Sequence, residues 1–206
     1  MQITIDRQQF RQAIAAVSLA LSSDDPSCVH ARHVLIDVTA NEATIVGCNR
    51  HWIAVYRATA TASRVTYVDG SERSEPTADP STARLLVRHD ALAVLIAWLK
   101  QQDKQGTITI DTDGTFTCNG ATHTITPGAC DYPPYAEVLR ICATPDAVTA
   151  PHAIVLSLDY VATILRAFKA VDEPAIMRFG GSDNPVWIGA PHGPLTCILM
   201  TINKQP

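Results

Sequence analysis

The same arrangement of apolar and polar positions occurs three times along the chain. The first copy opens with an alternating pair typical of a half-buried strand, Ile3 and Ile5. A helical stripe follows, formed by Phe10, Ile14 and Val17. Three strand-like runs complete this copy, at residues 34–39, 43–48 and 52–57. The pattern therefore predicts a β-α-β-β-β unit.

The second and third copies keep the spacing between the strand pair and the helical stripe. In the second copy these residues are Leu85, Val87, Leu92, Ile96 and Leu99. In the third copy they are Ile154, Leu156, Val161, Leu165 and Phe168. Asp113-Gly114 and Asn119-Gly120 are strong hairpin signals, which predict strands at residues 107–111, 115–118 and 122–126. Further strands are expected at residues 175–179, 185–188 and 195–202.

Three units predict an α+β protein of one and a half domains. Two units can pack into a complete two-layer domain over residues 1–140, interrupted by an exposed, mobile linker at 67–83 that is rich in Ser, Pro and acidic residues. A second linker is expected at 141–150, followed by a single half-domain at 151–206. Because one unit alone exposes an apolar flank and an open sheet edge, it should pack against the full domain or against another chain.

Composition narrows the class of protein. The 206 residues are 47% hydrophobic and 17% charged, an ordinary globular balance, and the net charge of −4 shows no overall basic excess. Six cysteines are scattered without a CxxC pair, which favours reduced thiols over a disulfide framework or a zinc site. The chain has neither a signal-peptide pattern nor an apolar run of membrane-span length, so we expect a cytoplasmic protein.

Three local motifs resemble one known family. Residues 48–55 (CNRHWIAV) are similar to a T-D-G-H-R-L-A-V run, and residues 132–139 (YPPYAEVL) to a Y-P-D-Y-x-x-V-L run. Residues 183–188 and 195–202 are similar to closing strands that end near L-M-P-V/M-R-L. Together with the repeat, these motifs resemble the sliding clamps of bacterial replication, the beta subunit of DNA polymerase III, over almost the whole chain.

The resemblance implies a DNA-clamp fold, with antiparallel sheets outside and helices inside. Clamps of this family are rings of six domains, each a pair of β-α-β-β-β units, and they encircle duplex DNA as processivity factors in replication. The resemblance therefore implies duplex DNA as a partner without sequence preference, bound in the nucleoid. It also implies docking of polymerase, clamp-loader or repair proteins through short linear motifs. With one and a half domains per chain, we expect a homo-oligomer, a tetramer or a dimer.

The resemblance also implies a hydrophobic peptide-binding pocket. Its walls would be Cys48, Arg50, Trp52, Ile53, Pro133, Val138, Pro185, Val186, Leu199, Met200, Thr201 and Ile202. Trp52 and Met200 are expected at the surface, whereas Ile53 and Val186 fit either a pocket or an ordinary core. Arg50, Trp52 and Thr201 replace the family's glycine, arginine and proline, and a pocket reshaped by Trp52 and Thr201 would select different partners.

The DNA-binding face would be the polar side of the three helices. Its basic residues would be Arg7, Arg11, Lys100, Lys104, Arg166 and Lys169. Two cations per helix suit loose, salt-sensitive contacts to phosphates without base readout. The alternative for each of these residues is that it lies on an ordinary solvent-exposed helix face and does not contact DNA.

The sequence gives little support to catalysis, and we expect no catalytic residue, no bound metal and no cofactor. Phosphate-loop and G-x-S-x-G motifs are absent from the sequence. Cys48 and His51 could be imagined as a nucleophile and base, but their spacing does not bring thiol and imidazole together reliably. Besides a clamp, one other class remains open: a protein-interaction module that binds clamp partners, or a clamp, without encircling DNA.

Overall fold

The computed structural model describes residues 2–22, 28–39, 41–63, 83–103, 105–143, 155–179, 184–190 and 193–202. Most of the predicted linker at 67–83 lies outside these ranges, although Ala83 already begins a strand. Residues 144–150 of the second linker, and the individually predicted Lys104 and Ile154, also lie outside them.

The first unit has the predicted order of elements. It comprises β1 (Gln2–Asp6), α1 (Arg7–Val17), two short 3-10 turns η1 (Ser18–Ala20) and η2 (Val29–Arg32), β2 (His33–Val38), β3 (Glu42–Cys48) and β4 (Trp52–Ser63). Asp6 caps α1, since its Oδ1 accepts a hydrogen bond of 2.8 Å from Gln9 N. The predicted stripe is confirmed, because Phe10, Ile14 and Val17 are fully buried.

The second unit repeats this order. It comprises β5 (Ala83–Arg88), α2 (His89–Gln101), β6 (Thr107–Asp111), β7 (Thr115–Cys118) and β8 (Ala121–Thr124). Asn119 and Gly120 have φ of 51° and 79°, the paired left-handed conformation that a two-residue hairpin turn requires. Leu92 and Leu99 are buried as predicted, but Leu95 and not Ile96 is the third fully buried residue of α2.

The third unit comprises α4 (Leu158–Val171), β9 (Ile176–Phe179), β10 (Val186–Gly189) and β11 (Leu195–Leu199). Leu156 was expected in a strand but lies in none. The helical stripe was also partly wrong: Leu165 is 47% exposed, and Ile164 takes the buried position beside Phe168. Period and offset alone placed Phe168 correctly, but they placed the buried position one turn earlier at Leu165 instead of Ile164.

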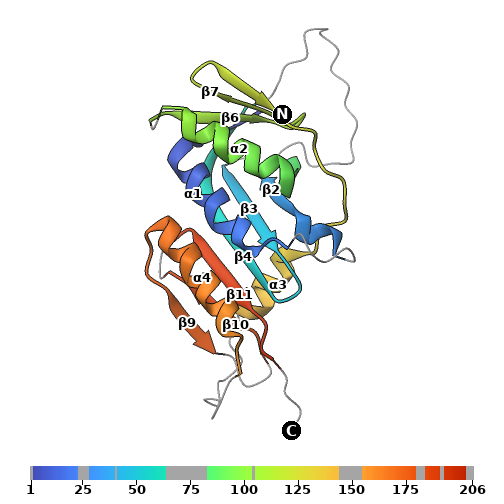
Figure 1. Ribbon diagram of the computed structural model, residues 1–206, viewed down its shortest axis with the longest axis vertical. Coiled ribbons are helices and arrows are strands. Elements are labelled where there is room, and N and C mark those ends of the chain that lie inside the picture. The colour runs from blue at the N-terminus through green and yellow to red at the C-terminus, as the bar shows by residue number, and fades with distance from the viewer. Residues whose placement is uncertain are drawn as a thin grey trace.

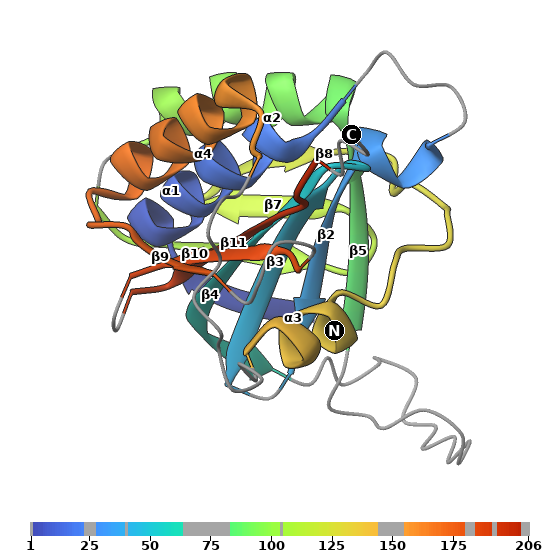
Figure 2. The ribbon, with the colours of Figure 1, turned by 90° about the horizontal axis from the view of Figure 1, so that it is seen from below.

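The units are joined by exchanged strands. β1 pairs with β6 of the second unit, and β5 pairs with β2 of the first unit, so each unit completes the sheet of the other. The long strand β4 pairs with β3 over residues 53–59 and with β1 over residues 60–63. Figure 2 shows α1, α2 and α4 side by side on one face of the strands.

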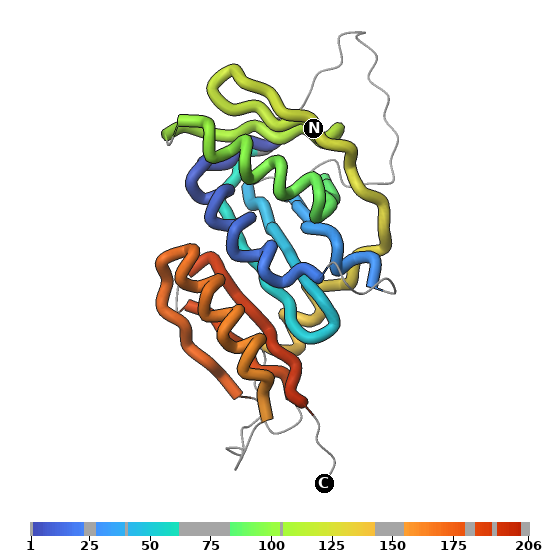
Figure 3. Tube along the Cα trace, viewed as in Figure 1, coloured from blue at the N-terminus to red at the C-terminus, as the bar shows by residue number. Residues whose placement is uncertain are grey.

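The third unit packs against the first through the edge of β11. β11 pairs antiparallel with β4, with Leu199 opposite Trp52 and Leu195 opposite Tyr56. In the chain trace the C-terminal unit lies beside α1 and β4, and α1 lies between α4 and α2 (Figures 1 and 3). The junction is therefore a continuous sheet with a continuous helix layer.

One helix was not predicted. α3 (Tyr135–Ala143) covers the part of the sequence that was assigned to a family motif and to the start of a linker. It lies on the face of the sheet opposite to the other helices (Figure 2). Its position gives the sheet a second, smaller apolar layer.

Candidate peptide-binding and DNA-binding surfaces

The strands at the β4–β11 junction send alternate side chains to opposite faces. Trp52 and Leu199 belong to the large core under α1 and α4, whereas Ile53 and Ile198, the neighbouring pair, belong to a smaller cluster under α3. Val186 also lies in the large core, and it is fully buried like Leu199. Because Trp52 is only 2% exposed, the expectation of a surface position for this residue was wrong.

The smaller cluster unites three predicted pocket residues, Cys48, Ile53 and Val138. Its other members were missed: Leu35, Val46, Val55, Leu139 and Ile198, with the partly buried Leu86, Tyr132, Tyr135, Cys142 and Trp187. Alternation along β11 would have placed Ile198 here, but only once the pairing register with β4 was known. We call this set the α3-side cluster.

Two tyrosines fix the segment that leads into α3. Tyr132 donates its hydroxyl to Val46 O at 3.0 Å, and Tyr135 donates to Asp37 Oδ2 at 2.8 Å. Burial raises the pKa of Tyr132 and raises that of Tyr135 to about 12, so both remain proton donors at neutral pH. Pro133, a predicted wall residue, is held half-buried between them.

The surface beyond β11 supplies exposed apolar side chains. Met200 is 48% exposed, as expected, and Ile202 is 42% exposed. The backbone of this segment is held in place, since Met200 N donates to His51 O at 2.8 Å. Thr201 is half-buried two residues after the end of β11, and Pro185 is half-buried immediately before β10. An apolar rim therefore adjoins the junction.

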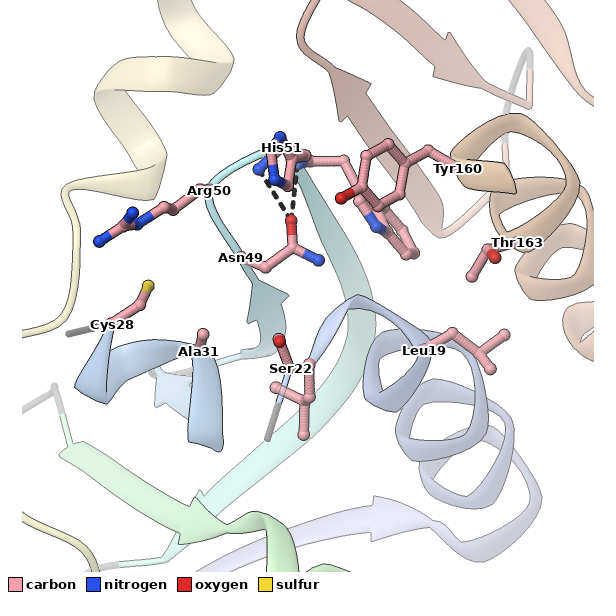
Figure 4. Close-up of a pocket in the computed structure, with 11 residues that line it drawn as sticks. Leu19, Ser22, Cys28, Ala31, Asn49, Arg50, His51, Tyr160 and Thr163 are labelled. Atoms are coloured by element: carbon pink, nitrogen blue, oxygen red, sulfur yellow. Dashed lines mark hydrogen bonds between the residues drawn. The ribbon is translucent and has the colours of Figure 1, made fainter. Parts of the chain in front are cut away.

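A cavity of about 250 Å³ opens on the helix side of the same junction (Figure 4). The turn between β3 and β4 forms one wall, with Arg50 and His51, and α4 contributes Tyr160 and Thr163. The remaining lining residues are Leu19, Leu21, Ser22, Cys28, Ala31, Asn49 and Trp52. Of the predicted pocket residues, only Arg50 and Trp52 line it.

The turn that forms this wall is ordered by local contacts. Asn49 Oδ1 accepts from the backbone N–H groups of His51 and Trp52, at 2.8 and 3.0 Å. The His51 ring stacks on Tyr160 of α4, with centroids 4.8 Å apart. This stacked pair links the first unit to the third, and no sequence motif indicated it.

The predicted basic face is smaller than expected. Arg11, Lys100, Arg166 and Lys169 are exposed on the helix layer. Arg7 is not: it is 2% exposed, and its Nη2 donates to the carbonyls of Leu99 and Gln102 at the end of α2. The prediction that Arg7 belongs to a solvent-facing basic surface is therefore wrong, because the second unit covers it.

Cys48 and His51 do not form a catalytic pair. Burial raises the pKa of the Cys48 thiol to about 11, the opposite of what a nucleophile needs. Its side chain lies in the α3-side cluster, whereas His51 stacks on Tyr160. Within the described ranges, no three His, Cys, Asp or Glu side chains gather as a metal site would require, and no helix combines the length and apolarity of a membrane span.

Comparison with solved structures identifies the fold. The DNA polymerase III beta subunit of Pseudomonas aeruginosa superimposes with a TM-score of 0.73 at 13% identity, over 99% of this chain and 66% of that one. The beta subunit of Thermotoga maritima gives 0.68 at 11% identity, over 99% and 65%. That of Streptococcus pyogenes gives 0.66 at 11% identity, over 100% and 66%.

These likenesses show that the chain has the sliding-clamp fold. A scan against protein-family models and a search of curated proteins give no match. The chain spans about two thirds of the length of the clamp chains that it matches.

Proposed function

We propose that this protein is a reduced sliding clamp, a non-catalytic platform that encircles duplex DNA and docks replication or repair proteins. The observation that carries the proposal is the clamp fold itself, which accounts for 99% of the chain and includes the sheet junction between β4 and β11. The raised pKa of Cys48 argues against this thiol as a nucleophile.

The helix layer would face DNA. Arg11 on α1, Lys100 on α2, and Arg166 and Lys169 on α4 are exposed on that layer and could each contact a phosphate. Exposed carboxylates of Asp90 and Asp159 on the same helices weaken the field, so the contacts would be loose and strongly salt-dependent. Weak contacts suit a protein that slides, provided that ring closure prevents it from leaving.

Partner proteins would dock at the β4–β11 junction. The exposed Met200 and Ile202 offer adaptable apolar contacts, and the cavity beside His51 and Tyr160 offers a place for one larger side chain. Binding energy in such sites comes from a few anchors. Since Trp52 is buried and Arg50 stands at the cavity wall, selectivity would depend on Arg50 more than on Trp52.

DNA encirclement is tested by retention on circular and linear DNA. The chain is assembled from dilute, dissociated protein in the presence of a nicked plasmid, and the complex is isolated by gel filtration. Cutting the plasmid once should release the protein, because a topologically linked ring slides off free ends. Equal retention before and after cutting would refute encirclement. An Arg166→Glu and Lys169→Glu double variant should lower retention at moderate salt.

Partner docking is tested separately with fluorescein-labelled hexapeptides that carry two or three apolar residues. Met200→Glu and Ile202→Glu should each weaken binding at least tenfold, while melting temperature stays unchanged because both side chains are partly exposed. Val94→Glu on α2 is the matched control, since Val94 is 56% exposed and lies on a different surface. Equal effects of all three substitutions would contradict docking at this junction.

A second function is favoured by the weak basic face of the helix layer. Because the exposed Arg11, Lys100, Arg166 and Lys169 lie on the same helices as the exposed Asp90 and Asp159, the chain could serve as an interaction module that binds clamp partners without encircling DNA. Such a module would bind the peptides and would show no difference between circular and cut DNA. The two experiments together therefore separate the alternatives.

A further inference from the structure

A thiol and an imidazole meet at the wall of the cavity on the helix side of the β4–β11 junction. Cys28, the residue before η2, has its Sγ 3.1 Å from Nε2 of His30. Cys28 is only 3% exposed, but it lines the cavity of about 250 Å³. Because a water molecule takes about 30 Å³ in the liquid, this cavity has room for small solutes. The buried thiol is therefore within reach of small molecules that enter the cavity.

The surroundings of this pair are electropositive. Figure 4 shows the Cys28 sulfur pointing toward the side chain of Arg50, on the turn between β3 and β4. Burial and, after it, the positive charge of Arg50 lower the pKa of His30, so that its ring is neutral at pH 7. A neutral imidazole can accept the thiol proton, and a nearby guanidinium stabilises the thiolate that results. Cys28 thus has both a base and a cation beside it.

Two further cysteines lack this combination. Cys48 is also 3% exposed, but it lies in the α3-side cluster, where burial raises its pKa to about 11. Cys130 Sγ lies 3.8 Å from His33 Nδ1, and the same nitrogen is 2.9 Å from Val29 O. Because a carbonyl oxygen only accepts hydrogen bonds, His33 Nδ1 carries the proton and has no lone pair for the Cys130 thiol. Cys28 is therefore the better candidate for a reactive thiol.

We propose that Cys28 is an oxidation site, at which a small hydroperoxide that enters the cavity converts the thiol to a sulfenic acid. His30 takes the thiol proton, and the thiolate sulfur attacks one oxygen of the peroxide. The O–O bond breaks as the S–O bond forms, so the sulfur loses two electrons and the peroxide gains them. The leaving hydroxide takes the proton from His30 and departs as water. Thiol and hydrogen peroxide thus give sulfenic acid and water.

The oxidation site does not depend on the proposed function, because it requires only the thiol, its neighbours and the cavity. One consequence does rest on the proposed function. If a partner side chain enters this cavity, an added oxygen on Cys28 changes the space and the polarity that the side chain meets. Oxidation should then weaken partner docking, and because a sulfenic acid can be reduced again by thiols, the change would be reversible.

The rate of oxidation of each cysteine tests the proposal. Native protein is exposed to hydrogen peroxide for increasing times and is then unfolded in urea with dimedone, which marks sulfenic acids, and N-ethylmaleimide, which blocks the remaining thiols. Mass spectrometry of the peptides gives each rate. We expect Cys28 to be oxidised at least tenfold faster than Cys48, which has the same exposed fraction, and faster than the more exposed Cys130 and Cys142. Protein unfolded before exposure should show no such preference.

Variants test the roles of the neighbours. His30→Phe removes Nε2 but keeps a ring for the edge contact with Tyr132, whose centroid lies 6.2 Å away, and it should slow oxidation of Cys28 at least tenfold. His123→Phe is the matched control, since His123 is also half-buried and contacts an aromatic ring, but on β8. Arg50→Gln, at an exposed position, should also slow oxidation of Cys28. Circular dichroism and thermal melting check that each variant folds, and the comparison of Cys28 with Cys48 needs no variant.

Two outcomes would overturn the proposal: oxidation of Cys28 in the native protein that is no faster than that of Cys48, or an unchanged rate in folded His30→Phe. The fluorescein-labelled peptides test the consequence for docking, since peroxide should weaken their binding to the native protein but not to Cys28→Ser. Peptides that bind neither protein would refute docking at the junction and leave the oxidation site standing.

Discussion

Arg7 offers a sharp test of how the first two units hold together. Its side chain is 2% exposed, and its Nη2 donates to Leu99 O and, at 3.0 Å, to Gln102 O. These carbonyls end α2, where backbone acceptors have no intrahelical partner. Replacing Arg7 with Met keeps most of the apolar stem and removes both hydrogen bonds and the charge.

The expected loss of stability follows from these contacts. A hydrogen bond to a charged group contributes about 1.5–3 kcal/mol, so two bonds give at most about 6 kcal/mol. Two effects reduce this figure: the substitution also relieves the desolvation of a buried guanidinium, and the Nε of Arg7 has no hydrogen-bond partner among the residues that the structure describes. We therefore expect a net loss of about 2–3 kcal/mol, which corresponds to a fall in melting temperature of roughly 5–10 °C for a chain of this size.

Urea unfolding and calorimetry of Arg7→Met give both quantities, with Arg11→Met as the matched control one turn further along α1. Arg11 is exposed, so its substitution should change the free energy of unfolding by less than about 0.5 kcal/mol. If the helix layer faces DNA as proposed, Arg11→Met should weaken DNA binding more than Arg7→Met, because Arg11 is exposed and Arg7 is buried. Equal stability of Arg7→Met and the native protein would refute the structural role of Arg7.

Three further predictions concern packing, anchoring and thiol reactivity. Gly47→Ala should cost about 3 kcal/mol or more by urea unfolding, since its Cβ would lie 2.1 Å from Val17 O. Gly120→Ala, with φ of 79° and no atom near its Cβ, should cost only about 1 kcal/mol, and the reverse order would contradict the packing. Tyr135→Phe should lower stability by about 1 kcal/mol through one lost hydrogen bond, and no change would show that this bond is not formed in solution. Because burial raises the pKa of Cys48 to about 11, its thiol is mostly protonated at pH 8. Iodoacetamide at this pH should therefore leave Cys48 unmodified in the native protein, whereas all six cysteines should react in urea. Rapid labelling of Cys48 in the native protein would argue against its burial.

The sequence by itself determined the repeated units and most of their elements. The stripe of Phe10, Ile14 and Val17 identifies a helix because helical periodicity is local, and Asn119-Gly120 identifies a hairpin because its backbone conformation depends on those two residues. The motifs that resemble those of clamps, together with the repeat, were sufficient to predict the fold that the solved structures share.

Only the tertiary structure decided which faces of these elements meet other parts of the chain. Arg7 has the sequence appearance of a surface cation, and it is buried because α2 ends above it. Trp52 is buried because the register of β4 with β11 turns it toward the helices, while Ile53 turns toward the unforeseen helix α3. Burial depends on partners that are distant in sequence, so a local pattern can define an element and leave its exposed side undetermined.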